Sequence, residues 1–188
     1  MVIRAFPPVD YADRTGLLAI GGDCEAESLI LAYKSGIFPW EGEPLMWFAP
    51  PKRAVLFLKD FHVPTSLIRT IRKRQFEIRW NSDFRSVMLG CAQATNRHGG
   101  QGTWITDELI DGYCELFNSG QAYSVEAFQD NRLVGGVYGV RINKMISAES
   151  MFYIEPNASK VALVNLVERF RSEGIEWIDC QAINPFTK

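Results

Sequence analysis

From residue 61 onward, hydrophobic and polar positions follow the periods of strands and helices. Strand-like patterns occur in five segments, at residues 76–80, 122–128, 133–141, 145–152 and 177–181. Helical spacing occurs in four, at residues 65–74, 83–91, 106–119 and 157–171. The turn dipeptides Asp130-Asn131 and Asn143-Lys144 join three of the strands, which predicts an antiparallel meander. The pattern predicts an α/β (α+β) fold with a mixed, mostly antiparallel sheet flanked by helices.

The first sixty residues lack this regular periodicity. We therefore expect a small domain of residues 1–60 and a second domain of residues 61–188. A helix after Gly21-Gly22 turns Tyr33 inward and stops at Gly36. Residues 37–51 combine bulky aromatics with four prolines, which favours a stiff loop over a regular element. That loop is either a proline-pinned small core or an aromatic wall on which a base could stack.

Composition narrows the class of protein. The chain has 188 residues, 47% hydrophobic and 22% charged, with a formal net charge of -2. No apolar run approaches the ~20 residues that span a bilayer, and the N-terminus does not resemble a secretory signal. The four cysteines form no CxxC pair, and His62 and His98 adjoin no carboxylate cluster. We therefore expect a cytoplasmic protein with reduced thiols and no metal.

Seven positive charges lie between residues 52 and 79: Lys52, Arg53, Arg69, Arg72, Lys73, Arg74 and Arg79. Such a run is most often a solvated helix face. It is also what a local phosphate-contacting patch for a nucleic-acid end would look like. Both interpretations stay open on the sequence alone.

The segment Asp179-Cys180-Gln181 holds the most informative polar residues. On a strand, Asp179 and Gln181 would point to the same face. A carboxylate and a carboxamide on an apolar strand are costly to bury without partners. The pair is therefore either part of a satisfied hydrogen-bond network or the floor of a functional site.

Two helices, a meander, a helix and a strand resemble the acyl-CoA N-acyltransferase layout. Those enzymes hold the coenzyme A pyrophosphate in a glycine-containing turn that opens a helix. At that place this chain reads Glu155-Pro156-Asn157-Ala158-Ser159-Lys160. The layout therefore predicts a C-terminal domain like the N-acyltransferases, but without coenzyme A or another cofactor.

Eight segments, in this order and spacing, resemble one family closely, at residues 16–23, 32–40, 102–106, 123–126, 133–140, 149–152, 157–160 and 178–181. The family is the bacterial leucyl/phenylalanyl-tRNA–protein transferases. The resemblance implies transfer of Leu or Phe from aminoacyl-tRNA to the N-terminal α-amine of proteins that begin with Arg or Lys. The product is an N-degron that marks the protein for degradation. It also implies aminoacyl-tRNA and acceptor proteins as partners, in a monomer that needs no cofactor.

The resemblance also assigns residues. Asp179 and Gln181 match the family's relay, with Gln181 near the attacking amine and Asp179 as base, as orienting group or as the holder of the acceptor's cationic side chain. Glu149 matches a glutamate of the same site that would bind the aminoacyl amine or ribose. The residues assigned to the tRNA 3′ end are Trp40, Trp104 and Tyr33. Those assigned to the donor's side-chain pocket are Val137, Ile146, Met151 and Leu166, each of which also suits a hydrophobic core.

Four departures from the family pattern shape the expectations. Ala148 replaces a glycine, Ile146 and Leu166 replace common phenylalanines, and residues 184–186 replace Asn-x-His. The choice between Leu and Phe as donor therefore stays open. Family members usually continue past the position of Lys188, so we expect a short member or a truncated chain. Two alternatives remain: a degenerate aminoacyl-tRNA-binding protein without turnover, and an acyl-CoA-dependent N-acyltransferase.

Overall fold

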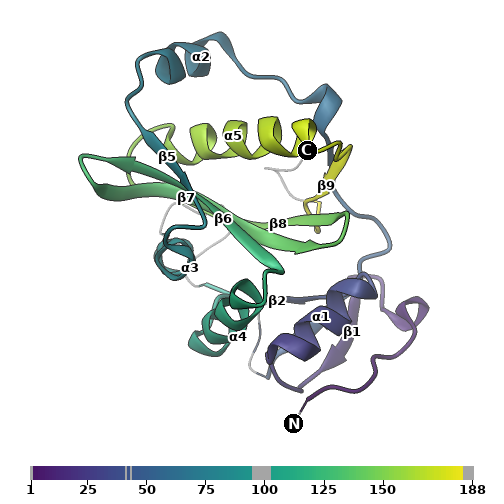
Figure 1. The fold of residues 1–188 in the computed structure, drawn as a ribbon. Coiled ribbons are helices and arrows are strands. Elements are labelled where there is room, and N and C mark those ends of the chain that lie inside the picture. Colours follow the sequence, from purple (N-terminus) through teal and green to yellow (C-terminus); the bar gives the residue numbers. More distant parts are fainter. Residues whose placement is uncertain (1, 41, 43, 95–102, 184–188) are drawn as a thin grey trace.

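The computed structural model describes residues 2–40, 42, 44–94 and 103–183 of the chain. Within these residues, helices and strands build two sheets and their covering layers (Figure 1). The helices are η1 (Val9–Tyr11), α1 (Ala26–Lys34), η2 (Leu58–Asp60), α2 (Thr65–Arg72), α3 (Phe84–Gln93), α4 (Asp107–Asn118) and α5 (Ala158–Ser172). The strands are β1 (Leu17–Ile20), β2 (Phe38–Trp40), β3 (Met46–Phe48), β4 (Val55–Phe57), β5 (Glu77–Trp80), β6 (Ala122–Gln129), β7 (Arg132–Ile142), β8 (Met145–Tyr153) and β9 (Trp177–Asp179).

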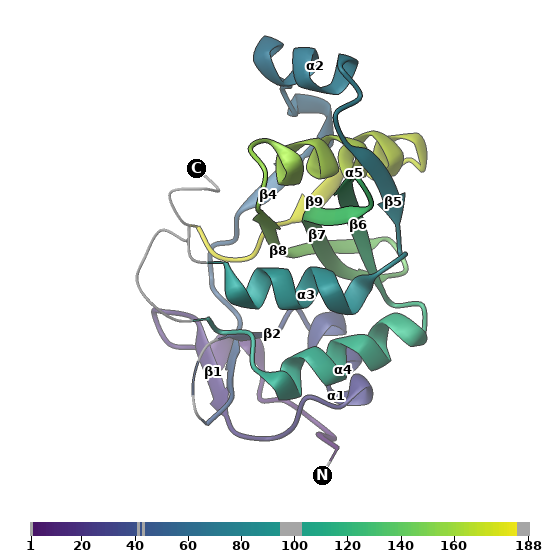
Figure 2. The same cartoon turned by 90° about the vertical axis from the view of Figure 1, so that its left-hand side faces the viewer.

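The larger sheet has the strand order β4-β9-β8-β7-β6-β5. All its neighbours are antiparallel except β8 and β9, which run parallel. Helix α5 covers one face, and α3 and α4 cover the other (Figures 1 and 2). The predicted α/β class and the meander of β6, β7 and β8 are confirmed. The element order that suggested the N-acyltransferase layout, α3, α4, the meander, α5 and β9, is present as well.

The described residues between 37 and 51 do not form the stiff loop that the sequence predicts. Strands β2 and β3 pair with each other and with β1, in the order β1-β3-β2. Proline argues against a central strand because it cannot donate to the ladder, but it is tolerated at a sheet edge. Pro39 lies in β2, an edge strand, and the prediction was wrong because edge position is not visible in sequence.

Strand β4 shows where the large sheet begins along the chain. Its residues Val55, Leu56 and Phe57 pair with Asp179, Ile178 and Trp177 of β9. The sheet therefore recruits residues from within the expected first domain of residues 1–60. The division at residue 60 stays a prediction.

Two of the three hydrophobic clusters among the described residues join the large sheet to the layers on its two faces. One fills the space between the sheet and α5, with Ile146, Leu166 and Phe170 buried in it. The other continues from α3 and α4 into α1 and the small sheet, through residues such as Tyr113 and Trp47. Because the second cluster is continuous, it fixes the N-terminal unit against α4 and against β7 of the large sheet.

Gly135, in the middle of β7, allows α5 to approach the sheet. A Cβ at this position would lie 2.6 Å from the Cβ of Ala158 at the start of α5. The ladder between β6 and β7 also shifts register at Ala127/Phe128, opposite this region. Glycine at position 135 therefore lies where a bulge and a close backbone approach coincide.

Helix α5 begins at Ala158, and Asn157 occupies the position before it. Asn157 is left-handed, with φ of 72°, and its side chain makes no capping hydrogen bond. Asn157 thus stands at the helix boundary that the sequence predicts without acting as a side-chain cap. None of the helices in the described parts of the chain has both the length and the apolar character needed to cross a membrane.

Candidate active site

The carboxylate of Glu149 is the centre of a hydrogen-bond cluster where the large sheet meets the N-terminal unit. Glu149 stands at a β-bulge: Tyr138 pairs with Ser150 and Gly139 with Ala148, so Glu149 is the extra residue on β8. A bulge re-aims a side chain and reverses the alternation of the strand beyond it. Before the bulge Ile146 contacts the cluster beneath α5, and after it Met151 does, although the two are five residues apart.

Three donors address the Glu149 carboxylate. The Ser147 hydroxyl donates to Oε1 at 2.6 Å, and the Gln181 side-chain amide donates to Oε2 at 2.7 Å. The Tyr113 hydroxyl adds a long contact to Oε2 at 3.5 Å. The Tyr33 hydroxyl lies 2.5 Å from that of Tyr113. Because a tyrosine hydroxyl has one proton, a Tyr113 that donates to Glu149 receives its own bond from Tyr33.

The surroundings of Glu149 change its proton affinity. Burial raises the pKa of its carboxyl group, and the hydrogen bonds from Ser147 and Gln181 act in the opposite direction. The negative charge of Asp179 raises the pKa further. The net pKa lies above the ordinary value of 4.5, while part of the residue remains exposed to solvent. A carboxyl group with this balance is suited to exchanging protons with a bound substrate.

Gln181 does not lie on a strand as the sequence predicts. Strand β9 ends at Asp179, and Gln181 adopts a left-handed conformation with φ of 62°. The Gln181 backbone N–H donates to Oδ1 of Asp179 at 2.8 Å, so the aspartate side chain closes the turn. Asp179 and Gln181 therefore do not point to one face of a strand, and this prediction is wrong. Both side chains do belong to a hydrogen-bond network, and the second interpretation, the floor of a functional site, stays a prediction.

Asp179 is paired with Arg53. The guanidinium donates to both carboxylate oxygens, from Nε to Oδ1 at 3.2 Å and from Nη2 to Oδ2 at 2.5 Å. The side chains of Arg53 and Asp179 are 23% and 14% exposed. A two-point, largely buried pair of this kind is among the stronger charge-assisted contacts in proteins. This partly buried ion pair with Asp179 distinguishes Arg53 from the exposed basic residues of the run.

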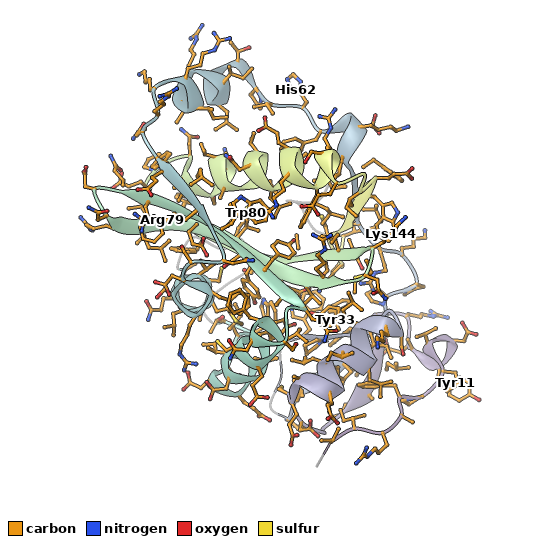
Figure 3. All side chains as sticks on the ribbon, in the orientation of Figure 1. Tyr11, Tyr33, His62, Arg79, Trp80 and Lys144 are labelled. Atoms are coloured by element: carbon orange, nitrogen blue, oxygen red, sulfur yellow. The ribbon has the colours of Figure 1, made fainter. Side chains whose placement is uncertain are left out.

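Apart from Lys52, which adjoins Arg53, the remaining basic residues of the run lie elsewhere. Arg69, Arg72, Lys73 and Arg74 are exposed on α2 and just after it, above α5 and away from the N-terminal unit (Figure 1). Arg79 pairs with Glu77 on the edge strand β5, and Figure 3 places it at the end of the sheet distant from Tyr33. The question whether α2 contacts phosphate stays open.

Trp40 and Trp104 line one pocket of about 360 Å³. Trp40 comes from β2 and Trp104 from the segment before α4, so the fold brings together two residues that are 64 positions apart. The rest of the lining is Gly42, Leu45, Thr106, Asp107, Glu108 and Leu109. Tyr33, assigned with them from the sequence, lies instead between α1 and the large sheet at the Glu149 cluster (Figure 3).

The pocket and the Glu149 cluster are neighbours along α4. Leu109 lines the pocket, and Tyr113, which contacts Glu149, follows four residues later. Positions four apart lie on the same helix face and are separated by about 6 Å along the axis. One face of α4 therefore joins the pocket lining to the residue that contacts Glu149.

The four residues assigned to an apolar side-chain pocket do come together. Val137, Ile146 and Leu166 are buried in the cluster beneath α5, and Met151 packs against it with part of its surface exposed. Their placement is that of a hydrophobic core. Of the four, Met151 is the one with surface to offer a ligand.

His62 is exposed on the segment before α2 (Figure 3), and His98 lies outside the described residues. Among the residues that the structure describes, no group of three or more His, Cys, Asp or Glu side chains is arranged to hold a metal ion.

Two family models match the chain. The model for leucyl/phenylalanyl-tRNA protein transferase matches residues 55–188, and the model for that enzyme's N-terminal domain matches residues 22–51. A leucyl/phenylalanyl-tRNA–protein transferase of Flavobacterium johnsoniae is 46% identical over 181 residues, covering 95% of this chain and 85% of the relative. One of Hydrogenovibrio crunogenus is 47% identical over 180 residues, covering 94% of this chain and 70% of the relative. The chain belongs to this family.

Similarity to solved structures concerns the fold alone. A conserved protein of unknown function from Bacteroides thetaiotaomicron matches with a TM-score of 0.50 at 12% identity, over 69% of this chain and 51% of that one. Membership of the leucyl/phenylalanyl-tRNA–protein transferases confirms the resemblance seen in the sequence and makes the chain a transferase. It decides against the acyl-CoA-dependent alternative.

Sequence reasoning missed three members of the site in this transferase. Arg53 counted only as one of a basic run, and Ser147 and Tyr113 were not singled out. Ser147 stands two residues before Glu149 and within reach of its carboxylate, which is a local signal. Arg53 and Tyr113 give no such signal, because their contacts span 126 and 36 residues of sequence.

We predict that Gly139→Ala displaces the Glu149 bulge. A Cβ at Gly139 would fall on the Ser147 carbonyl oxygen and lie 2.5 Å from the Tyr123 hydroxyl, which donates to that carbonyl at 2.9 Å. Overpacking of this kind costs about 1–3 kcal/mol. We expect a loss of that size in urea unfolding and a loss of transfer per folded molecule. Val140→Ala, a buried neighbour, should lose stability but keep transfer; a Gly139→Ala protein with normal stability and rate would disprove the bulge argument.

Proposed function

We propose that the chain transfers Leu or Phe from aminoacyl-tRNA to the N-terminal α-amine of proteins beginning with Arg or Lys. The observation that carries this proposal is the Glu149 carboxylate, held by Ser147 and Gln181 one helical turn along α4 from the Trp40 and Trp104 pocket. A nucleoside pocket beside an organised carboxylate fits an ester carried on the 3′ end of a tRNA. Family membership supports aminoacyl-tRNA and protein as the two substrates.

The pocket supports the assignment of the tRNA 3′ end. Its volume of about 360 Å³ falls in the range of small-ligand sites. Indole rings are the side chains on which an unpaired base stacks, and each such contact is worth about 1–3 kcal/mol. In this arrangement the terminal adenosine lies against Trp40 and Trp104, and its aminoacyl ester extends along α4 toward Tyr113 and Glu149.

The chemistry asks little of the protein beyond positioning. An aminoacyl ester is already activated, so the acceptor amine attacks the carbonyl carbon, a tetrahedral intermediate forms, and the ribose oxygen leaves. The amine must first lose a proton, and an α-amino group has a pKa of about 8. Glu149, whose pKa is raised, accepts that proton and returns it to the departing ribose oxygen. Gln181 keeps the carboxylate in place during both steps.

Two further parts of the proposal concern the rest of the protein. The exposed cations of α2, Arg69, Arg72, Lys73 and Arg74, contact the phosphate backbone of the tRNA away from its 3′ end. The enzyme works in the cytoplasm, where charged tRNA and nascent protein N-termini meet, and it acts as a monomer that tags its acceptors for degradation. Met151, backed by the buried residues Val137, Ile146 and Leu166, forms the wall nearest the donor's side chain.

The test is transfer of radiolabelled leucine and phenylalanine, from separately charged tRNAs, to peptides that begin with Arg, Lys, Asp or Ala. We expect label on the Arg and Lys peptides alone, and the ratio of the two donors ranks Leu against Phe. Label on the Asp or Ala peptide would contradict the acceptor assignment. Binding of charged tRNA without transfer to any peptide would instead identify a degenerate binding protein.

A further inference from the structure

Arg53 ties the N-terminal unit to the turn that carries Gln181. Its Nη1 donates to the carbonyl oxygen of Gly36 at 2.9 Å, and its guanidinium carbon lies 4.9 Å from the centre of the Phe38 ring in β2. Its other two donors hold the carboxylate of Asp179. One side chain thus contacts the end of α1, the strand that presents Trp40, and the end of β9.

The backbone next to Arg53 strengthens the same junction. The Ala54 N–H donates to the carbonyl oxygen of Gln181 at 2.8 Å, and the Cys180 N–H donates to the carbonyl oxygen of Ala54 at 2.8 Å. Arg53 therefore lies beside residues 179–181 by main-chain pairing, and its guanidinium needs no long reach to find Asp179. The fork is a built feature of the sheet edge between β4 and β9.

The Asp179 carboxylate is already engaged on both oxygens. Oδ2 receives Nη2 of Arg53, and Oδ1 receives both Nε of Arg53 and the backbone N–H of Gln181. A cationic side chain from an acceptor would have to displace the Arg53 fork to reach this carboxylate. A base that abstracts the amine proton would have to do so while paired with a permanent positive charge. Neither role suits Asp179 in this arrangement.

We propose that Arg53 is a positioning residue for the transfer reaction: it fixes Asp179, and Asp179 holds Gln181 in the turn that places its amide on Glu149. This inference rests on the proposed function for its kinetic consequences. It assigns Asp179 to the support of Gln181, and it leaves Glu149 and Gln181 as the groups that meet the substrate.

The backbone of Gln181 explains why support is needed. A left-handed conformation in a residue other than glycine costs of order 1–3 kcal/mol and persists when its surroundings enforce it. The bond from Gln181 N–H to Asp179 supplies that enforcement only while the carboxylate is held still. Arginine is suited to this because its planar fork binds two oxygens at once and its remaining donor reaches Gly36.

The kinetic test compares Arg53→Ala and Arg53→Lys with wild type, using Arg141→Ala as a matched control. Arg141 also pairs with a carboxylate, that of Glu173 rather than Asp179, and lies over an aromatic ring, that of Phe170. We expect kcat to fall about 10- to 100-fold in Arg53→Ala and less in Arg53→Lys, with KM for charged tRNA and for peptide unchanged. Added guanidinium ion should restore part of the kcat of Arg53→Ala.

A double-mutant cycle asks whether Arg53 acts through Asp179. In an Asp179→Asn background, Arg53→Ala should change kcat by less than about twofold, since coupled residues are non-additive. Three results would overturn the proposal. A lower KM for the acceptor peptide in Arg53→Ala would mean that Arg53 competes with the acceptor's cation for Asp179. A raised KM for charged tRNA with additive effects would make Arg53 a phosphate contact. An unchanged kcat would remove any role in the reaction.

A second readout does not depend on turnover. The side-chain amide signals of Gln181 in the nuclear magnetic resonance spectrum are assigned by their loss in Gln181→Leu. We expect them to shift toward free-amide values in Arg53→Ala and to stay in place in Arg141→Ala. Unchanged Gln181 signals in Arg53→Ala would refute the positioning role, whether or not the wild type transfers. If the wild type transfers nothing but the signals shift, the proposed function fails and the positioning stands.

Discussion

Replacing Glu149 with alanine is expected to lower kcat/KM for transfer by about 100-fold or more, a loss of about 2.7 kcal/mol of transition-state stabilisation. The alanine removes the carboxylate that Ser147 and Gln181 organise. Positioned proton transfer contributes about 10²- to 10⁴-fold to the rate in enzymes. The remaining rate of this reaction comes from the reactivity of the aminoacyl ester itself. Steady-state transfer to an Arg-initiated peptide measures the effect.

Two companion variants separate chemistry from folding. Glu149→Gln keeps the size of the side chain and loses the proton acceptor, so its kcat should fall nearly as far as that of Glu149→Ala. Glu168→Gln makes the same change on the exposed face of α5 and should transfer normally. Wild-type rates in folded Glu149→Ala and Glu149→Gln proteins would remove Glu149 from the mechanism.

The raised pKa of Glu149 makes a linked prediction about stability. The folded state binds the proton of Glu149 more tightly than the unfolded state does. The contribution of Glu149 to the free energy of unfolding therefore falls as the pH rises from 4.5 through the folded pKa. The slope from one such group cannot exceed about 1.4 kcal/mol per pH unit. The free energy of unfolding of wild type minus that of Glu149→Gln should therefore fall with rising pH in this window. A difference that rises instead would mean that the folded pKa is lowered.

Periodicity in the sequence was sufficient to predict most of the large domain. The strands of the meander bury nearly continuous or alternating apolar faces, and their turns carry Asp130-Asn131 and Asn143-Lys144. Each of these elements can therefore be predicted from its own residues alone. The small sheet was missed for a physical reason. Its strands β2 and β3 are only three residues long, and Pro39 in β2 is tolerated because β2 lies at the edge of the small sheet.

The site shows the same limit at the level of single residues. Motifs pointed to Glu149, Gln181 and Asp179, and the structure does gather them. The motifs do not encode the orientation of these side chains. Glu149 is aimed by a bulge that depends on close packing at Gly139, and Gln181 by a left-handed turn. Both depend on contacts between strands, which a local pattern does not encode. The Arg53 fork spans 126 residues and could not be read from the basic run around it.

Trp40→Ala is expected to raise KM for charged tRNA about tenfold and to change KM for the acceptor peptide by less than about twofold, since stacking on a base is worth about 1–3 kcal/mol. Trp40 and Trp104 line the same pocket, so Trp104→Ala should have an effect of similar size. Trp40→Phe keeps an aromatic face and should lie between wild type and the alanine variant. These values come from transfer assays in which one substrate is varied while the other is saturating.

The test depends on comparing the change in KM for charged tRNA with the change in KM for the acceptor peptide. Trp177 is 41% exposed on β9 and does not line the pocket, so Trp177→Ala controls for the loss of an exposed indole. If Trp40 holds the 3′ end, kcat at saturating charged tRNA stays near the wild-type value, because the Glu149 cluster is untouched. A larger change in KM for the peptide than for the tRNA would place Trp40 on the acceptor's side of the reaction. The pocket would then receive the protein substrate, and the ester would approach Glu149 from elsewhere.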